Sequence, residues 1–278
     1  MLRYRLLAID IDGTLVNSRD ELTPATRVAL SRVAEAGIRI VLATGRRYSR
    51  TLPLVEPLGI DVPLVTASGA LVKDPLDHRT LYRAEFDQGL LRRTLAIVAE
   101  HGFDSIIYAD TFSEGFDFYY PRMDVSTRQL AEYLEMNPDC GHHWPQLVSD
   151  PPPEIFAGFT MGTQGQMLNL EHALHQGLPR QLHTHVLRSP RYTGFMCEFS
   201  ADGVTKWSAI HRLAEQWGIG EESICAVGDD VNDIPMIRAA GLGVAMGNAQ
   251  PQVKAAADWI VSSHDEDGLV QVAQRLLK

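Results

Sequence analysis

The sequence has few cysteines, and none of them is placed for metal binding or redox chemistry. The three cysteines are Cys140, Cys197 and Cys225, and no two of them form a C-x-x-C pair. An odd, scattered set is a poor disulfide framework, so we expect reduced thiols in a soluble cytoplasmic protein. No apolar run reaches the length of a membrane span, and Asp10 and Asp12 interrupt the short N-terminal run, which argues against a signal peptide.

Positive charge is scarce as well. The chain carries 25 Lys and Arg residues against 35 Asp and Glu residues, for a formal net charge of −10. Such a surface argues against nucleic acid or anionic membrane as the main partner. A small anionic ligand is compatible with this charge, because a local cluster of basic residues and metal can make the electrostatic potential positive inside one cleft. The sequence does not indicate an oligomeric state.

Several common functional motifs are missing. There is no Walker A motif, and Gly241-Leu-Gly243 lacks the third glycine at the dinucleotide-binding spacing. The histidines at 142–143, 183 and 185 belong to no H-E-x-x-H or Cys/His framework, so packed or exposed histidines are a better interpretation than zinc ligands.

Alternating strands and helices open and close the chain. The segment from Arg5 to Ile11 is a continuous apolar run, as expected of a strand buried on both faces. Thr23-Pro24 begins a helix, and further strands are predicted at 38–42 and 63–66. The alternation resumes near Val204, with strands at 223–227, 242–245 and 259–261. This pattern predicts an α/β fold with a doubly wound, parallel, Rossmann-like sheet.

The middle of the chain follows another pattern. Between residues 85 and 191 the predicted strands follow one another directly, which favours an antiparallel α+β arrangement. We therefore predict a discontinuous core of residues 1–84 and 192–278, with an inserted α+β cap domain of residues 85–191.

Two acidic residues mark the end of the first predicted strand, in Asp10-Ile-Asp12-Gly13-Thr14. Residues at i and i+2 share one face of a strand, so the two carboxylates lie close together and need a shared proton or a cation. Ligands of open α/β sheets bind beyond this end of the strands, and the glycine turn can direct backbone N–H groups at an anion. The simpler alternative is a solvated turn.

Other polar residues are predicted to reach the same edge of the sheet. Thr44-Gly45-Arg46 ends the second strand, and its hydroxyl and guanidinium can hold phosphoryl oxygens; a plain helix N-cap at Thr44 is the alternative. Gly228-Asp-Asp-Val-Asn-Asp233 follows the strand at 223–227. Mg²⁺ prefers oxygen ligands, which Asp10, Asp229 and the Asp12 carbonyl can supply, with Asp233 holding a metal-bound water. Acidic residues that favour a helix N-terminus are the alternative.

Lys206 is predicted at the first turn of a helix, where the helix dipole disfavours a cation. A neighbouring acidic cluster or a bound phosphate would explain this position, and a solvated lysine is the alternative.

In this order, D-x-D-G-T, T-G-R, a lysine and G-D-x-x-N-D resemble the motifs of the haloacid dehalogenase superfamily. The insert resembles the C2-type cap of the Cof-like sugar-phosphate phosphatases. The resemblance implies a Mg²⁺-dependent phosphatase that hydrolyses small phosphorylated metabolites through an aspartyl phosphate, with Asp10 as nucleophile and Asp12 as general acid and base. It implies phosphate binding by Gly13, Thr44, Gly45, Lys206 and Asn232.

Two other functions remain open: a phosphomutase with the same aspartates, or a catalytically silent regulator that binds sugar phosphates. The chain departs from the subfamily at Ser68, where Asn is usual, and at Trp207, where Gly is common. Candidate residues for leaving-group selection in the cap are Phe116, Tyr119, Arg122 and Trp144.

Overall fold

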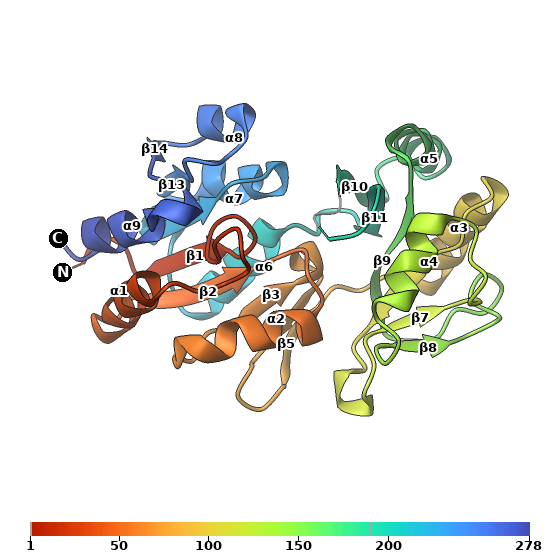
Figure 1. Cartoon of the computed structure of the whole chain (residues 1–278), viewed down its shortest axis with the longest axis horizontal. Coiled ribbons are helices and arrows are strands. Elements are labelled where there is room, and N and C mark those ends of the chain that lie inside the picture. The colour runs from red at the N-terminus through yellow and green to blue at the C-terminus, as the bar shows by residue number, and fades with distance from the viewer. Residues whose placement is uncertain (1, 189–190) are drawn as a thin grey trace. The chain divides into compact units, whose positions relative to one another are not determined.

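The computed structural model describes residues 2–188 and 191–278, and the chain forms two compact units (Figure 1). The core unit joins the residues up to Tyr82 with those from Thr205 to Lys278, and the inserted unit covers Arg83–Val204. The inserted unit therefore ends later than residue 191, the predicted boundary. The reason is β11 (Phe195–Ala201), which hydrogen-bonds to β9 and β10 in the sheet of the inserted unit.

The core unit contains an eight-stranded sheet in the order β14-β13-β12-β1-β2-β3-β4-β5. The five pairs from β14 to β3 are parallel, whereas β3 and β4 are antiparallel. The predicted α/β class is thus confirmed, with an antiparallel extension at one side. The strands are β1 (Leu6–Asp10), β2 (Arg39–Ala43), β3 (Leu64–Thr66), β4 (Leu71–Lys73), β5 (Thr80–Arg83), β12 (Ile224–Gly228), β13 (Leu242–Ala245) and β14 (Trp259–Ile260).

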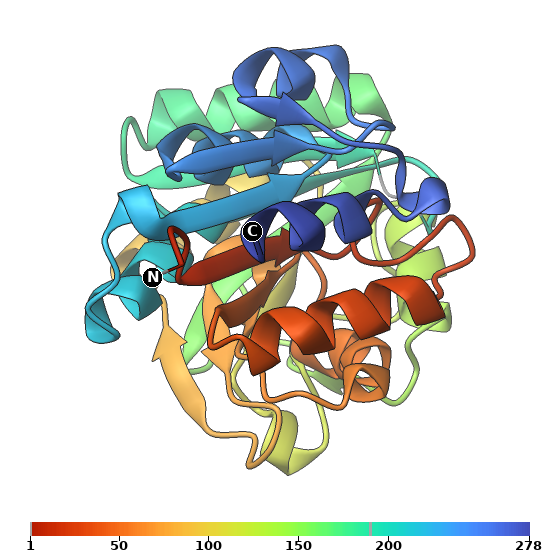
Figure 2. The same ribbon diagram turned by 90° about the vertical axis from the view of Figure 1, so that its left-hand side faces the viewer.

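Helices cover both faces of this sheet. Alternate side chains such as Leu6 and Ala8 of β1 pack with those of α6 and α7, while α1 and α9 lie side by side over the other face (Figure 2). Local signals set the start of α1: the Thr23 side chain accepts a hydrogen bond from the Thr26 backbone N–H, and Pro24 occupies the first turn. The helices are α1 (Pro24–Glu35), α2 (Tyr48–Val55), α6 (Lys206–Gln216), α7 (Ile234–Ala239), α8 (Pro251–Ala256) and α9 (Gly268–Leu276).

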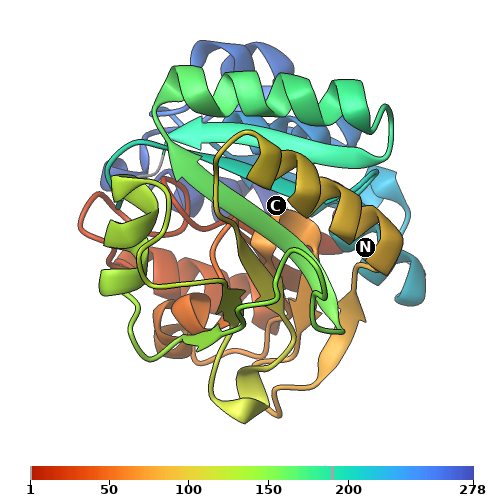
Figure 3. The same ribbon diagram turned by 90° about the vertical axis from the view of Figure 1, so that its right-hand side faces the viewer.

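The inserted unit is a six-stranded sheet in the order β10-β11-β9-β6-β7-β8, with α3 and α5 across one face (Figure 3). Its pairs are antiparallel except β7–β8, which is parallel because α4 lies between the two strands in the chain. The remaining elements are α3 (Gln88–Glu100), β6 (Ile106–Ala109), β7 (Phe118–Tyr120), α4 (Arg128–Glu135), β8 (Gly141–His143), β9 (Ile155–Gly162), α5 (Gln164–Gly177) and β10 (Leu182–Arg188). Neither unit has a described helix that is long and apolar enough to cross a membrane.

Candidate active site

Asp10 occupies the carboxyl end of the central strand β1 and is almost fully buried. The Nζ atom of Lys206 lies 2.6 Å from Asp10 Oδ1 and 2.7 Å from Asp233 Oδ1. Lys206 reaches them from the first turn of α6, which is capped by Thr205 and Ser208. The two carboxylates supply the negative charge that a lysine at a helix N-terminus calls for.

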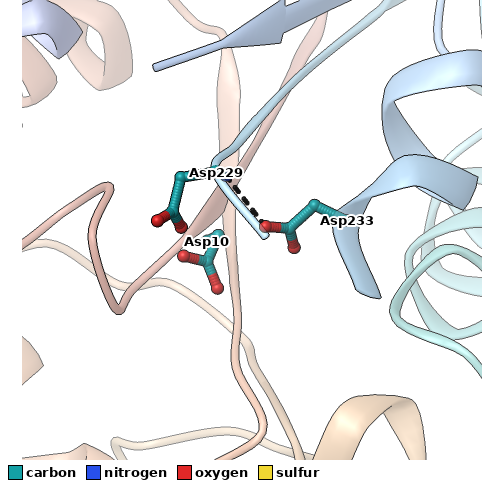
Figure 4. Close-up of side chains that lie close together, drawn as sticks. All are labelled: Asp10, Asp229 and Asp233. Atoms are coloured by element: carbon teal, nitrogen blue, oxygen red, sulfur yellow. Dashed lines mark hydrogen bonds between the residues drawn. The ribbon is translucent and has the colours of Figure 1, made fainter. Parts of the chain in front are cut away.

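Asp229 completes an acidic cluster with Asp10 and Asp233. One carboxylate oxygen of each residue lies within 4.8 Å of the others, and the three side chains surround one small volume (Figure 4). Asp233 is held in place because its Oδ2 accepts hydrogen bonds from the Asp229 and Asp230 backbone N–H groups, at 3.0 and 3.1 Å. Gly228 permits this turn, since a Cβ there would lie 2.4 Å from Asp233 Cγ. The cluster is therefore formed at the ends of the adjacent strands β1 and β12.

Within the described part of the chain, the side chains around this cluster do not balance its charge. Burial and the Asp233 charge raise the pKa of Asp10 well above its usual range. Burial, with Asp233 and Asp230, raises the pKa of Asp229 to about 7. Burial alone would lower the pKa of Lys206, but Asp10 and Asp233 raise it, so the lysine stays charged. One lysine thus faces three carboxylates.

This arrangement fits a divalent cation. The cluster offers hard carboxylate oxygens, which Mg²⁺ prefers. Among the described residues, the buried Asp10 Oδ2 receives no hydrogen bond, so an oxygen is available as a ligand or as a nucleophile. A cation would also relieve the mutual repulsion that raises the carboxyl pKa values.

The Gly13-Thr14 turn is packed directly against Asp229. Gly13 has a φ of +77°, and a Cβ there would lie 2.3 Å from Asp229 Oδ2. Thr14 Oγ1 donates to Asp229 Oδ1 at 3.4 Å. Asn248 Nδ2 donates to the Gly13 carbonyl oxygen at 2.8 Å and to Asp229 Oδ2 at 3.2 Å, so it links the turn to the acidic cluster. Asn248 was not among the predicted site residues, although it follows the end of β13, where the same strand-end rule applies.

Thr44 and Arg46 both contact Asp12. Thr44 Oγ1 donates to Asp12 Oδ2 at 3.2 Å, and Arg46 Nε lies 2.9 Å from each Asp12 oxygen. Arg46 Nη2 also donates to Asp12 Oδ1 and to Asp20 Oδ1. Burial opposes charge on Asp12, but the Arg46 hydrogen bonds and charge outweigh it and lower the pKa of Asp12. In the structure Arg46 thus holds Asp12, rather than being left open for phosphoryl oxygens.

Asn232 and Gly45 also lie at this edge of the core sheet. Lys206 Nζ approaches Asn232 Oδ1 at 3.4 Å, which places the amide beside the lysine. Gly45 adjoins Ser68, whose Oγ would lie 3.4 Å from a Cβ at position 45. The predicted site residues of the core unit therefore gather at the carboxyl ends of β1, β2 and β12, as the sequence pattern indicated.

Ser68 is held in the left-handed region of backbone conformation, with φ of +56°. We expect Ser68→Gly to raise the free energy of unfolding by about 1 kcal/mol, because glycine accepts this conformation without steric cost. Gly69→Ala is the opposite control: it should lower stability by about 1–3 kcal/mol, since φ is +108° and a Cβ would lie 2.1 Å from the Thr205 carbonyl oxygen. Urea unfolding of both variants is the measurement, and a destabilised Ser68→Gly variant would contradict the expectation.

Trp207 and the four candidate residues of the cap all have contacts within their own units. Trp207 packs against the hydrophobic cluster of the core unit. In the inserted unit, Tyr119 makes edge contacts with Phe116 and Trp144, with ring centroids 5.1 and 5.6 Å apart, and all three pack against its core. Arg122 Nη2 pairs with Asp104 Oδ2 at 2.9 Å. These contacts account for the three aromatic residues and Arg122 by packing and ion pairing.

Comparisons with known proteins extend over nearly the whole chain. Residues 7–272 match the family model described as haloacid dehalogenase-like hydrolase. Phosphatase YwpJ of Bacillus subtilis is 30% identical, over 98% of this chain and 100% of that protein. Pyridoxal phosphate phosphatase YbhA of Escherichia coli is 28% identical over 96% of each chain. A crystal structure of a haloacid dehalogenase-like hydrolase from Bacteroides thetaiotaomicron has a TM-score of 0.79 and 27% identity, over 98% of this chain and 99% of that one.

These matches confirm the family that the motifs predicted. The matched residues cover both chain segments of the core unit and the inserted unit, so the relationship is not limited to a shared sheet. The chain therefore belongs to the haloacid dehalogenase-like hydrolases, and it is an enzyme related over its length to phosphatases of phosphoric monoesters.

Proposed function

We propose that this enzyme is a Mg²⁺-dependent phosphatase that hydrolyses small phosphate monoesters through a phosphorylated Asp10. The observation that supports the proposal most strongly is the buried group formed by Asp10, Lys206, Asp229 and Asp233 at the ends of β1 and β12. A nucleophilic carboxylate, a fixed cation and a cluster of hard oxygen ligands are the parts that aspartyl-phosphate chemistry needs.

In the first step, a carboxylate oxygen of Asp10 attacks phosphorus and the bond from phosphorus to the leaving oxygen breaks. Asp12 gives a proton to that oxygen, so the alcohol leaves uncharged. In the second step, Asp12 takes a proton from water as the water oxygen attacks phosphorus. The bond from phosphorus to Asp10 then breaks, which restores the carboxylate and releases inorganic phosphate.

The other residues bind and orient the transferred group. Lys206 carries a charge that does not depend on pH in the neutral range and can balance the phosphoryl oxygens. We propose that Thr44, Asn232 and the backbone N–H groups of Gly13 and Gly45 supply further donors. Asp12 receives hydrogen bonds on both oxygens, a geometry that suits the carboxylate it must be when it accepts the proton from water.

Asp10, Asp229, the Asp12 carbonyl and, through water, Asp233 are the proposed Mg²⁺ ligands. When bound, Mg²⁺ supplies charge neutralisation for the attacking carboxylate and the phosphoryl group. We expect phosphate release to stop in excess chelator and to return when Mg²⁺ is restored. We also expect Asp229→Ala to raise the Mg²⁺ concentration for half-maximal activity by more than about tenfold.

A neighbouring carboxylate provides the control for this metal prediction. Asp230 lies next to Asp229 but outside the cluster, and it caps the following turn through the Val231 backbone N–H. Asp230→Asn retains a capping side chain and should change the Mg²⁺ requirement far less than Asp229→Ala does. Full activity in chelator, or equal effects of the Asp229 and Asp230 variants, would contradict the metal assignment.

The overall proposal is tested by a panel of phosphate monoesters with Mg²⁺. The panel should contain sugar phosphates, nucleoside monophosphates, pyridoxal phosphate and an aryl phosphate, with released inorganic phosphate as the measurement. Pyridoxal phosphate is included because a relative with 28% identity carries that activity in its name. Phosphate release without a bisphosphate requirement distinguishes a phosphatase from a phosphomutase. Ligand binding with no turnover of any ester would instead support a silent regulator.

A further inference from the structure

Arg46 follows Thr44-Gly45, so the motif alone suggests that its guanidinium holds phosphoryl oxygens. The structure gives the guanidinium other partners. Its side chain is only 12% exposed, and it is engaged by two carboxylates, those of Asp12 and Asp20. Asp20 Oδ1 accepts from Arg46 Nη2 at 2.7 Å.

Asp20 is presented by a turn that is fixed independently of Arg46. The Asp20 backbone N–H donates to the Asn17 carbonyl oxygen at 3.0 Å, and the Asn17 side-chain oxygen accepts from the Arg19 and Glu21 backbone N–H groups at 2.9 and 3.0 Å. Asp20 therefore holds Nη2 of the guanidinium, while Nε and Nη2 both contact Asp12. Because the guanidinium is planar and contacts both Asp12 oxygens, it restrains the orientation of this carboxylate as well as its position.

From this geometry we propose that Arg46 is a positioning residue for Asp12, anchored by Asp20, and not a ligand of the transferred phosphoryl group. The inference rests on the proposed function, in which Asp12 transfers a proton during both the phosphorylation and the dephosphorylation of Asp10. A misplaced Asp12 slows proton transfer in both steps. An aryl leaving group departs without protonation, so with an aryl phosphate only the second step depends on Asp12.

The two possible roles of Arg46 therefore give opposite results in one measurement. If Arg46 positions Asp12, Arg46→Gln should slow turnover of an aryl phosphate by about 10–100-fold while phosphorylated Asp10 accumulates. Turnover of an alkyl phosphate should fall further. If Arg46 instead holds the phosphoryl group, the first step fails, no phosphoenzyme accumulates, and inhibition by inorganic phosphate weakens. Rapid-quench labelling with an aryl phosphate, followed by mass spectrometry of the peptide that contains Asp10, separates the two outcomes.

Asp12→Asn provides the reference for this experiment. It removes the proton-transfer group itself, typically about 10²–10⁴-fold in rate, and should also accumulate phosphorylated Asp10 with an aryl phosphate. If Arg46 acts through Asp12, adding Arg46→Gln to Asp12→Asn should cost little more, so the two effects should be strongly non-additive. Additive losses would overturn the proposal.

Two further variants test the role of Asp20 as the anchor of Arg46 and the role of the Arg46 positive charge. Asp20→Asn weakens the anchor of the Arg46 guanidinium, so it should show the same pattern as Arg46→Gln in weaker form. Arg46→Lys keeps a cation but loses the planar two-oxygen contact, so it should restore only part of the rate. Thermal unfolding of each variant identifies general destabilisation, and Asp20→Asn remains informative if Arg46→Gln does not fold. If the wild-type enzyme hydrolyses none of the esters, the proposed function is refuted. If the wild type is active and Asp20→Asn has the same turnover and phosphoenzyme level as the wild type, only this inference is refuted.

Discussion

Asp10→Asn is expected to abolish phosphate release and to prevent formation of any phosphoenzyme. The amide keeps the shape of the side chain but is not a nucleophile, and removal of a covalent nucleophile from a hydrolase costs about 10⁴–10⁶-fold in rate. Substrate affinity should be less affected, because Lys206 and the acidic cluster stay in place. Rapid-quench labelling with an aryl phosphate, alongside steady-state phosphate release, measures both expectations.

Loss of the fold should not be the reason for this inactivity. The pKa of Asp10 is raised by burial and by Asp233, so its stabilising contribution is present at low pH and is lost as the pH rises through the folded-state pKa. A neutral amide removes that penalty, so metal-free Asp10→Asn should unfold at no lower a temperature than the wild type above neutral pH. A phosphorylated peptide from the Asp10→Asn variant, or label on Asp12 in the wild type, would show that the nucleophile is assigned wrongly.

Much of the core sheet could be predicted because its signals are local. The apolar run that forms β1 is buried at every position, and Thr23-Pro24 begins α1 as the capping pattern indicates. Parallel strands separated by helices permit few topologies, which is why the α/β class followed from the alternation alone.

The errors in the fold prediction concern short or irregular strands. β8 is three residues long and pairs in parallel with β7, and β4 and β5 extend the core sheet after a left-handed turn near Ser68. Such strands lack a clear alternation of apolar and polar residues, and their pairing is decided by tertiary contacts. β11 is longer, with seven residues, but it lies beyond residue 191, the predicted end of the inserted domain.

The location of the candidate site could be predicted better than its hydrogen bonds. The strand-end rule placed Asp10 and Asp229 at one edge of the sheet, where the structure has them. The helix position of Lys206 favoured a neighbouring acidic cluster, which Asp10 and Asp233 provide. It could not show that Arg46 contacts Asp12 or that Asn248 links Gly13 to Asp229, because these contacts depend on side-chain direction across segments far apart in the chain. A motif therefore identifies the atoms available for chemistry, and the structure is needed to show which of them are already engaged.

Lys206→Met is expected to have the largest effect on stability as well as a large effect on activity. The lysine is 2% exposed and lies within 2.7 Å of both Asp10 and Asp233, so its removal leaves these buried carboxylates without their cation. Breaking a buried ion pair in this way typically costs about 3–5 kcal/mol. We also expect turnover to fall by about 10²–10³-fold, because Lys206 is a donor to the phosphoryl oxygens in the proposed function. Urea unfolding without metal and steady-state phosphate release are the measurements.

Arg19→Met provides a matched control for the loss of one positive charge. Arg19 pairs with Glu21 at 2.9 Å, but the two side chains are 75% and 57% exposed, so this variant should change the unfolding free energy by less than about 1 kcal/mol. Mg²⁺ separates the electrostatic effect from a simple packing defect in the Lys206 variant. If uncompensated carboxylates cause the instability, bound Mg²⁺ should stabilise Lys206→Met more than it stabilises the wild type, because it replaces part of the missing charge. An equal Mg²⁺ effect on both proteins would mean that the lysine acts mainly through packing.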